Sequence, residues 1–364
     1  MRIIHIVDHV GKVNFGIWSA AVILTPWLLE NHAVKSEIWF PADTLPDPIP
    51  DFYGAEPVAL PNTQVNQALN TATERGLNSA DTIIITHGTW RYPTLWGKVL
   101  KRAGYKWQYV PHGMLEPWSM QQKALKKKLY FNLIELPAAR GADMVRAVGA
   151  PELANLKRHF PKAVLRPNGV PVKDYPTKNW HGKRHVLFMA RLHHKKGVIP
   201  LIKAWLKSDL NRHDQWQLVI AGPDDGELST LNTVLDQNPG TNIQYLGSVY
   251  GVEKIQWLER SHFYALPTVS EGFPTSVVEA MQAGLIPLTS KGANFPEAMD
   301  AGLMVELTQA ENDIVSALNA IAQFSEQEYQ TLSNRCKDFI NQGYTLDVLG
   351  KTAFNDFQQL LKAV

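Results

Sequence analysis

Short apolar runs alternate with longer segments of helical periodicity along most of the chain. Apolar and β-branched runs predict buried strands, and apolar positions three and four residues apart predict helices. We expect strands at 2–8, 34–40, 82–86, 106–110, 144–148, 164–165, 185–190, 217–221, 242–246, 263–267 and 286–289. We expect helices at 16–31, 119–140 and 150–160, from 198, and through most of 309–363. The proline-bearing stretch 41–62 predicts a long loop. Two consecutive βα series are thus expected.

The most informative stretch is 266–284, LPTVSEGFPTSVVEAMQAG, which joins a strand to a helix. Pro274 suits the first turn of that helix, where its missing N–H is harmless. Gly284 suits the cap after its last turn. We expect free backbone N–H groups near Thr275 and Ser276, and such a helix start attracts phosphate.

Two carboxylates flank this helix start. Glu271 lies in the turn and Glu279 about one and a half turns into the helix. A carboxylate repels phosphate, but it accepts hydrogen bonds from sugar hydroxyls. An anion-binding helix start between two hydroxyl acceptors therefore predicts a nucleotide-sugar site.

Two cations follow the first strand of the second series. Arg191 ends this strand and Lys196 precedes the next helix. A forked guanidinium and a compact ammonium could hold a diphosphate from two sides. The intervening residues 193–195 are expected to be solvated neighbours.

The spacing Glu271-x7-Glu279, within S-x-E-G-F-P-x-x-x-x-E-A-M-x-x-G, resembles that of the retaining glycosyltransferases of the GT-B fold, family 4. The string ARLHHKKG at 190–197 is similar to the family's G-R-L-x-x-x-K-G, with Ala190 in place of glycine. The resemblance implies an α/β fold of two Rossmann-like β/α/β domains facing across a central cleft. We divide the chain into an N-terminal acceptor-binding domain (1–170), a linker (171–183), a C-terminal nucleotide-sugar-binding domain (184–344) and a helix that could return to the first domain (345–364).

The same resemblance implies roles for individual residues. In the family the first Glu lies near the donor sugar, the second lies near the ribose, and the Arg and Lys hold the diphosphate. Arg191, Lys196 and Glu271 are therefore predicted to be catalytic. Donor-binding residues are predicted at Gly222, Gly272, Phe273, Pro274, Thr275, Ser276 and Glu279. The assignment of the Gly222 strand end to the nucleobase rests on fold analogy.

The first half of the chain offers two further candidates. Gly11 and Gly16 bracket a loop between a strand and a helix, where backbone N–H groups could contact phosphate. The family often has paired glycines here, and the resemblance implies a donor-binding role for Gly16, although an ordinary turn is an equal alternative. His87 and His112 follow strand ends, where α/β proteins bind ligands. His112 matches the family's P-H-G element near the donor sugar, so it is predicted to be catalytic.

Residues 119–140 predict a long amphipathic helix, with Leu125, Leu129, Leu133 and Leu136 on one face. Lysines at 123 and 126–128 form a basic cluster beside that face. Two interpretations remain open, a solvated helix face and a surface that docks on anionic lipid.

Composition narrows the class of protein. The length of 364 residues favours two domains, and the charged fraction of 19% fits a soluble globular protein. A net charge of +2 does not indicate a nucleic-acid binder. The single cysteine, Cys336, suits a reducing cytosol. The N-terminus lacks the apolar core of a signal peptide. We find no metal-ligating motif and expect no cofactor besides the donor substrate.

These observations predict a metal-independent, retaining glycosyltransferase with a UDP- or GDP-linked sugar donor. The expected acceptor is a glycan or lipid-linked glycan of bacterial surface polysaccharide synthesis, and the expected location is the cytoplasm or the inner face of the plasma membrane. The alternatives are a nucleotide-sugar epimerase of the same fold and a non-catalytic carbohydrate-binding protein. The sequence leaves the base, sugar, acceptor and oligomeric state open.

Overall fold

The computed structural model describes residues 1–11, 14–47 and 49–363. The chain forms two compact units, Met1–Pro171 with Thr345–Val364, and Val172–Tyr344. Part of the predicted loop between Gly11 and Gly16 lies outside the described residues, as does the last residue of the predicted terminal helix.

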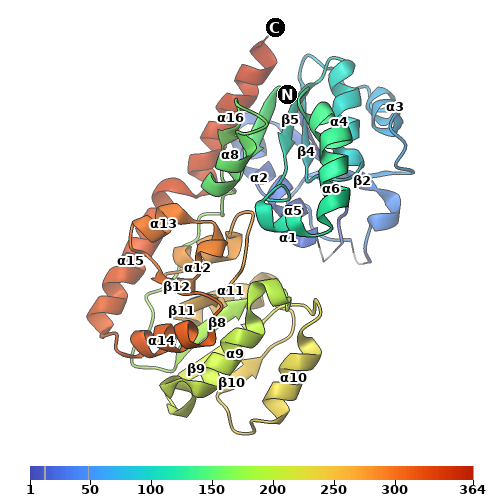
Figure 1. The fold of residues 1–364 in the computed structure, drawn as a ribbon. Helices are drawn as coiled ribbons and strands as arrows, with labels where there is room; N and C mark the ends of the chain where they lie inside the picture. The colour runs from blue at the N-terminus through green and yellow to red at the C-terminus, as the bar shows by residue number, and fades with distance from the viewer. Residues whose placement is uncertain (12–13, 48, 364) are drawn as a thin grey trace. The chain divides into compact units, whose positions relative to one another are not determined.

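A parallel sheet organises the first unit (Figure 1). Its described strands have the order β3-β2-β1-β4-β5-β6-β7, with every neighbouring pair parallel. They are β1 (Arg2–Ile6), β2 (Lys35–Pro41), β3 (Glu56–Leu60), β4 (Thr82–His87), β5 (Lys106–Val110), β6 (Met144–Ala147) and β7 (Val164–Leu165). The strand order changes direction between β1 and β4. Ligands of doubly wound sheets bind outside the carboxyl ends of the strands at such a switch point.

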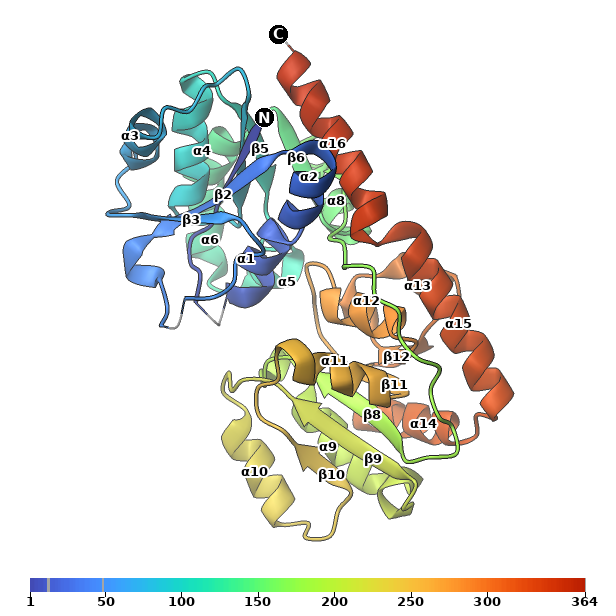
Figure 2. The same ribbon diagram turned by 180° about the vertical axis from the view of Figure 1, so that it is seen from behind.

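Helices cover this sheet. They are α1 (Phe15–Val22), α2 (Thr25–His32), α3 (Gln67–Glu74), α4 (Tyr92–Arg102), α5 (Pro117–Gln121), α6 (Ala124–Tyr130), α7 (Leu136–Ala139), α8 (Ala150–Leu156) and α16 (Leu346–Lys362). Figure 2 shows α16, at the end of the chain, beside α2 near its beginning, and the two helices are in contact. Gly350 of α16 makes this approach close, because a Cβ there would lie 2.5 Å from the Trp27 ring.

The core of the first unit is aromatic. Trp39, Trp96 and Trp107 are fully buried in one cluster. Gly97 of α4 lets the helix lie against this cluster, because a Cβ there would be 2.4 Å from the Trp107 ring. Burying such rings stabilises the unit by several kcal/mol, at about 25 cal/mol for each Å² of apolar surface.

Three sequence predictions for the first unit were wrong in detail. Residues 41–62 contain the edge strand β3 as well as a short 3₁₀ turn, Ala42–Thr44. The helix predicted at 16–31 is two helices, because Pro26 lies at the start of α2 and cannot donate to a continuing helix. The helix predicted at 119–140 is also divided, first at Lys123, which has a left-handed φ of 54°.

A π-helical turn, Phe131–Glu135, further interrupts this segment. Pro137 follows at the start of α7 and lacks the N–H that would continue the α-helical ladder. The interruption changes which side chains face the core. Leu136 is buried, whereas Leu125, Leu129 and Leu133 are exposed to 85%, 61% and 67%. The four leucines therefore do not share one buried face.

The second unit repeats the architecture. Its described strands form a parallel sheet in the order β10-β9-β8-β11-β12-β13. They are β8 (Arg184–Met189), β9 (Trp216–Ala221), β10 (Ile243–Tyr245), β11 (Phe263–Leu266), β12 (Ile286–Thr289) and β13 (Val305–Glu306). The helices are α9 (Val198–Lys207), α10 (Leu228–Asp236), α11 (Gly251–Arg260), α12 (Thr275–Gln282), α13 (Pro296–Asp300), α14 (Glu311–Ala322) and α15 (Glu326–Gly343), with 3₁₀ turns at His194–Lys196, Asp209–Arg212 and Lys291–Ala293. The predicted α/β fold of two Rossmann-like domains is confirmed.

The segment assigned to a linker packs within the second unit. The buried Lys178 donates to the carbonyl oxygens of Leu258 and Glu259 at 2.5 and 2.8 Å. Burial lowers the pKa of this ammonium to about 7. Residues 172–183 are thus a strap on the second unit.

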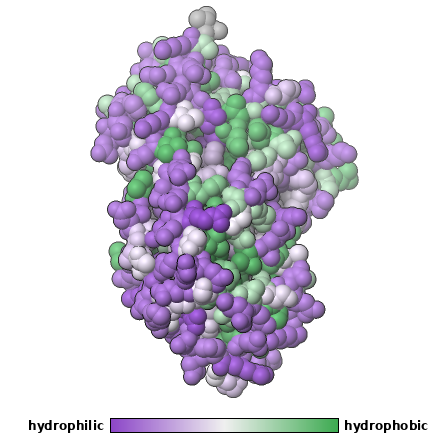
Figure 3. All heavy atoms as spheres, turned by 90° about the vertical axis from the view of Figure 1, so that its left-hand side faces the viewer, coloured by the Kyte–Doolittle hydropathy of each residue, from purple (hydrophilic) through white to green (hydrophobic). Residues whose placement is uncertain are grey.

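Hydrophilic residues predominate on the face shown in Figure 3, where hydrophobic residues form smaller patches. None of the helices in the described part of the chain has both the length and the apolar character needed to cross a bilayer.

Candidate functional site

A close ion pair joins two of the predicted catalytic residues. The Lys196 ammonium lies 2.7 and 2.6 Å from the two carboxylate oxygens of Glu271. The Thr268 hydroxyl donates to Glu271 Oε1 at 2.7 Å. The side chains of Lys196 and Glu271 are only 15% and 10% exposed, so water screens this pair less than it screens a surface pair.

Backbone contacts hold the two loops that carry this pair. The Val269 N–H donates to the Lys195 carbonyl oxygen at 2.8 Å, which ties the β11–α12 turn to the 3₁₀ turn after β8. Gly197 has a φ of +75°, and a Cβ there would lie 2.3 Å from the Pro267 carbonyl oxygen. Glycine is therefore needed for the loops to approach this closely.

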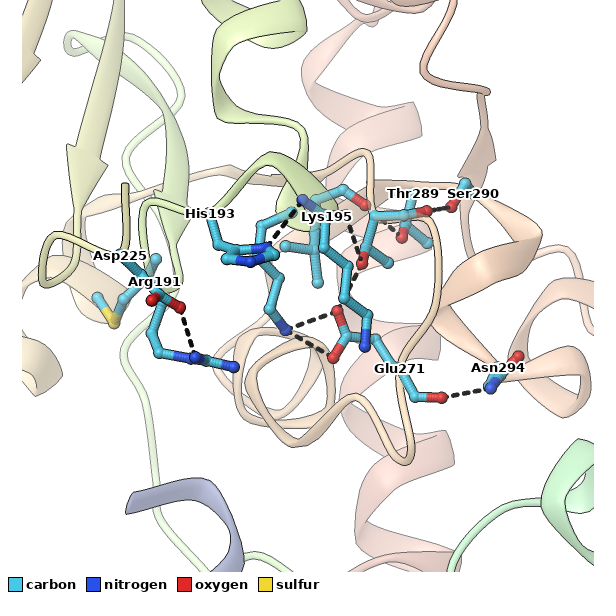
Figure 4. A network of polar contacts seen from close by, with 12 residues as sticks. Arg191, His193, Lys195, Asp225, Glu271, Thr289, Ser290 and Asn294 are labelled. Carbon is cyan, nitrogen blue, oxygen red and sulfur yellow. Dashed lines mark hydrogen bonds and ion pairs between the residues drawn. The ribbon is translucent and has the colours of Figure 1, made fainter. Parts of the chain in front are cut away.

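A second ion pair lies at the same strand end. The Arg191 guanidinium contacts Asp225 at 2.5 Å, as Figure 4 shows. Lys195 is half-buried, and burial lowers the pKa of its ammonium to about 8. The charges of Glu271, Lys196 and Arg191 also influence the Lys195 pKa, which places these four groups in one electrostatic neighbourhood. We call Arg191, Lys195, Lys196 and Glu271 the charged cluster.

His193, His194 and Lys195 lie between Arg191 and Lys196 and were expected to be solvated. Only one of them is. The His193 side chain accepts from the Lys195 N–H at 3.1 Å and so caps the 3₁₀ turn. Lys195 belongs to the charged cluster, and His194 is exposed. The prediction is thus wrong for His193, whose ring bonds back to the turn, and for Lys195, which is half-buried near Glu271.

The turn before α12 supplies the other predicted donor-binding residues. Gly272 and Phe273 are half-buried, and Pro274 is the N-terminal cap rather than a residue of the first turn. The Phe273 ring stacks on Tyr344, with the ring centroids 6.2 Å apart. The Thr275 N–H donates to the Phe273 carbonyl oxygen at 3.0 Å, so the expectation of a free amide at Thr275 was wrong.

The helix start is nevertheless placed beside the charged cluster. Ser276 lies in the first turn of α12, where amides have no acceptor within the helix. The Glu271 N–H donates to the Gly292 carbonyl oxygen at 2.7 Å, and the Asn294 amide donates to the Glu271 carbonyl oxygen (Figure 4). Asn294 takes the left-handed conformation, with a φ of 59°.

Glu279 is held separately on α12. Lys254 of α11 lies 2.6 Å from Glu279 Oε1, and the two side chains are 27% and 21% exposed. One carboxylate oxygen therefore has a cation partner, and the pair remains accessible to a ligand.

Gly222 is constrained by its neighbours. Its φ is +151°, and a Cβ would lie 1.8 Å from the Ala190 carbonyl oxygen. The Gly222 N–H donates to Gly247 at 2.8 Å, and Tyr245 donates to the Gly222 carbonyl oxygen at 3.1 Å. This glycine thus brings the end of β9 against the end of β8.

The remaining predicted residues lie in the first unit. Gly16 is an exposed residue of α1 with open space around it. His112 follows β5 with a left-handed φ of 55°, and its Nε2 lies 2.8 Å from His87 Nδ1. The next residue, Gly113, donates its N–H to Glu152 at 2.5 Å. Burial raises the pKa of this carboxyl to about 7.

Four neighbours of the site were missed by sequence reasoning: Lys195, Asp225, Lys254 and Thr268. Thr268 could have been found, because it lies in the same turn as Glu271. Asp225 and Lys254 belong to other loops and helices, and only the fold brings them to the site. In the described part of the chain, no group of three or more His, Cys, Asp or Glu side chains could hold a metal ion.

Parts of this chain are similar in sequence to known proteins. Residues 174–346 match the family model described as glycosyl transferases group 1. GDP-mannose:cellobiosyl-diphosphopolyprenol alpha-mannosyltransferase of Xanthomonas campestris is 30% identical over 176 residues, which are 46% of this chain and 46% of that protein. The gpi3 subunit of phosphatidylinositol N-acetylglucosaminyltransferase from Schizosaccharomyces pombe is 24% identical over 326 residues, which are 87% of this chain and 65% of that protein. The chain thus spans less than two-thirds of the length of these relatives.

Solved structures resemble the whole chain. Sucrose-phosphate synthase from Thermosynechococcus elongatus has a TM-score of 0.78 at 16% identity and covers 100% of both chains. HepE from Anabaena, in complex with UDP and glucose, has a TM-score of 0.74 at 15% identity and covers 98% of this chain and 99% of that one. At such low identity the likeness establishes the GT-B fold alone. Residues 174–346 are thus similar to the glycosyl transferases group 1 family, and they belong to a chain with the GT-B fold.

Proposed function

We propose that the protein is a retaining, metal-independent glycosyltransferase. It moves a sugar from a UDP- or GDP-linked donor to a glycan or lipid-linked glycan acceptor in surface polysaccharide synthesis. The observation that carries the proposal is the charged cluster beside the start of α12, above all the contact of Lys196 with both oxygens of Glu271. Cations beside a carboxylate suit a ligand that is anionic at one end and rich in hydroxyls at the other.

The cations supply what the departing diphosphate needs. Arg191, Lys195 and Lys196 place positive potential where negative charge develops as the bond from the anomeric carbon to the diphosphate breaks. The acceptor hydroxyl forms the new bond to the same carbon, and its proton goes to the departing diphosphate. Charge stabilisation of this kind is worth about 10²–10³ in turnover for one donor group.

Glu271 is better suited to binding than to covalent attack. Lys196 contacts both carboxylate oxygens, and Thr268 also donates to one of them. Such a carboxylate is stabilised as an anion but has reduced nucleophilicity. Glu271 therefore positions donor hydroxyls, and retention follows from attack on the face that the diphosphate leaves.

The names of the relatives support the acceptor class. The Xanthomonas protein acts on a cellobiosyl-diphosphopolyprenol. A relative from Campylobacter jejuni, 27% identical over 161 residues, acts on a glycan linked to PP-undecaprenol. A lipid-linked glycan is accordingly the first acceptor class to test here.

An exposed surface on the first unit fits a membrane-bound acceptor. Leu125, Leu129 and Leu133 are exposed, and the exposed lysines 123, 126 and 128 are their neighbours in sequence, whereas the half-buried Lys127 donates to the Ser119 carbonyl oxygen. Exposed leucines beside lysines match a bilayer surface of anionic lipids, where each basic residue contributes about 1 kcal/mol. The proposed enzyme docks there by this basic leucine surface.

Vesicle flotation tests the docking. The protein should float with vesicles that contain an anionic phospholipid and not with purely zwitterionic ones. Replacing Leu125 and Leu129 by serine should weaken flotation by about tenfold or more, because these side chains lose their transfer into lipid. Val252→Ser is the matched control, since Val252 is 70% exposed in the second unit. Equal flotation of all three proteins would contradict this part of the proposal.

A donor panel tests the reaction. UDP-, GDP- and ADP-sugars are incubated with a polyprenyl-diphosphate glycan, and the products are analysed by mass and by anomeric NMR coupling. We expect one added sugar with the donor's anomeric configuration, formed equally in the presence of EDTA. Conversion of the donor to an epimer without acceptor would instead identify an epimerase. Binding without any product would identify a carbohydrate-binding protein.

A further inference from the structure

A chain of three histidines crosses the switch point of the first sheet. His5 lies on β1, His87 ends β4, and His112 follows β5. His5 Nδ1 lies 3.1 Å from His87 Nε2, and His87 Nδ1 lies 2.8 Å from His112 Nε2. His5 and His87 are 6% and 1% exposed, whereas His112 is half-buried. One end of the chain is thus buried, and the other is accessible to a ligand.

The imidazoles are neutral at physiological pH. Burial, assisted by the charge of Arg146, lowers the pKa of His5 to about 3. Burial also lowers the pKa of His87 and that of His112, and Arg146 contributes to both. A neutral imidazole has one N–H donor and one lone pair. Because His87 uses both nitrogens, it must donate to one neighbour and accept from the other.

This requirement couples the three rings. In one state His5 Nδ1 donates to His87 Nε2, and His87 Nδ1 donates to His112 Nε2. His112 Nε2 is then an acceptor, so the proton of His112 is on Nδ1. In the other state every proton moves to the opposite nitrogen, and His112 Nδ1 has a lone pair. The free nitrogen of His5 takes the opposite character in each state.

Arg146 distinguishes the two states. Arg146 is half-buried, and its guanidinium donates to the carbonyl oxygens of Arg166 and Pro167 and to Asn168 Oδ1, all of them neutral acceptors. Among the described residues no carboxylate bonds directly to this guanidinium, although Glu152 and Asp356 lie within electrostatic range. Arg146, His5 and His87 line one cavity together with Arg166 and Asp356, which pair with each other and leave Arg146 as the charge in excess. A positive charge in this cavity favours a lone pair on the free nitrogen of His5.

The geometry points to His5 and His87 as positioning residues that hold His112 in the Nδ1–H tautomer. His112 then presents a hydrogen-bond donor on its accessible edge, suited to an oxygen of the donor sugar. This role rests on the proposed function, whereas the tautomer itself can be measured without it. The sequence does not reveal this arrangement, because His5 and His87 are 82 positions apart and His87 and His112 are 25 positions apart.

Nitrogen NMR of the full chain with ¹⁵N-labelled histidine tests the assignment. The His112 signals are identified by their loss in His112→Gln. We expect a protonated Nδ1 and an unprotonated Nε2 in the two-bond proton–nitrogen pattern. The reverse pattern, or an equal mixture of tautomers, would overturn the inference.

A variant tests the coupling between the rings. His87→Phe removes the link, so the His112 pattern should shift toward a mixture of tautomers. His159→Gln, an exposed histidine of the same unit, should leave the pattern unchanged. If His87→Phe does not fold, His5→Gln gives the same test one ring further away. An unchanged His112 pattern in the folded variants would contradict the coupling.

Kinetics separate this inference from the proposed function. With the donor identified by the panel, His87→Phe should raise the donor KM by about 2- to 10-fold, the loss expected for one hydrogen bond, with kcat nearly kept. Unchanged KM with an altered tautomer would remove His112 from the sugar site. Absence of any transfer by the wild type would overturn the proposed function and leave the tautomer result standing.

Discussion

The carboxyl ends of the two sheets hold different kinds of polar group. In the second unit, Arg191 and Lys196 are charged, and each is paired with a carboxylate. In the first unit, His5 and His87 are buried and neutral, beside the guanidinium of Arg146. The difference follows from desolvation, because a buried charge persists only when it is paired or well hydrogen-bonded. A charged edge suits a diphosphate, and a neutral edge suits hydroxyl groups.

Of the predictions made here, replacement of Lys196 on the charged edge should have the largest effect on activity. Lys196→Ala removes the cation that contacts both Glu271 oxygens and lowers the positive potential at the proposed diphosphate site. We expect kcat with the preferred donor to fall by about 10² or more. Lys291→Ala is the control, because Lys291 is 81% exposed and forms its ion pair with the exposed Glu306. Wild-type turnover in Lys196→Ala would contradict the diphosphate assignment.

The packing of the charged edge can be broken without removing a charge. In Gly222→Ala the new methyl group would meet the Ala190 carbonyl oxygen at 1.8 Å. We expect the second unit to lose about 1–3 kcal/mol of stability from this overpacking. Gly226→Ala is the matched control, since its φ is also positive but nothing lies within 4 Å of the added Cβ. Equal losses in thermal unfolding would show that backbone strain, and not contact, makes Gly222 necessary.

The charged edge and the histidine chain also differ in how far they could be predicted from the sequence. The fold was predictable because buried parallel strands are continuous apolar runs, and β5 and β12 begin and end where the pattern places them. The motifs at the two strand ends predicted that Lys196 and Glu271 belong to one site, but they did not predict the direct contact of the two side chains. The histidine chain was not, because it depends on the order of β1, β4 and β5 in the sheet.

Local backbone events account for most of the errors. A left-handed Lys123 and the proline at 137 divide a segment whose periodicity predicts one helix. Lysine has no intrinsic preference for that conformation, so periodicity alone cannot place the break. The edge strand β3 was missed because its sequence, EPVAL, contains a proline, which edge strands tolerate.

The stability of the first unit should depend on acid pH because His5 on the neutral edge is kept uncharged by the fold. Because the folded-state pKa of His5 is about 3 and the unfolded value is about 6.5, its contribution is full above pH 6.5 and is lost as the pH falls toward 3. Between pH 7.5 and 5, the wild type should lose about 2 kcal/mol more than His5→Gln. Hydrogen exchange of β1 and β4 amides measures this difference.

Other groups cancel in that comparison. Glu152, whose pKa burial raises to about 7, opposes the histidines between pH 4.5 and 7, but it is present in both proteins. Arg146 is also common to both. His87 contacts His5 directly, so the difference measures the coupled pair and not His5 alone. Parallel curves for the wild type and His5→Gln would show that His5 is not kept neutral by the fold.

The smallest expected effect concerns Gly16, the predicted donor-binding residue of the first unit. Gly16 lies in α1 with nothing within 4 Å of an added Cβ, so alanine fits without contact. Because alanine favours helix, Gly16→Ala should stabilise the first unit by about 0.5–1 kcal/mol. Thermal unfolding measures this change, and donor KM measures the second consequence. If donor phosphate approaches the Gly16 backbone, the added methyl group raises KM although stability improves. An unchanged KM with a more stable protein would make Gly16 an ordinary helix residue and restrict donor contacts in the first unit to other positions such as His112.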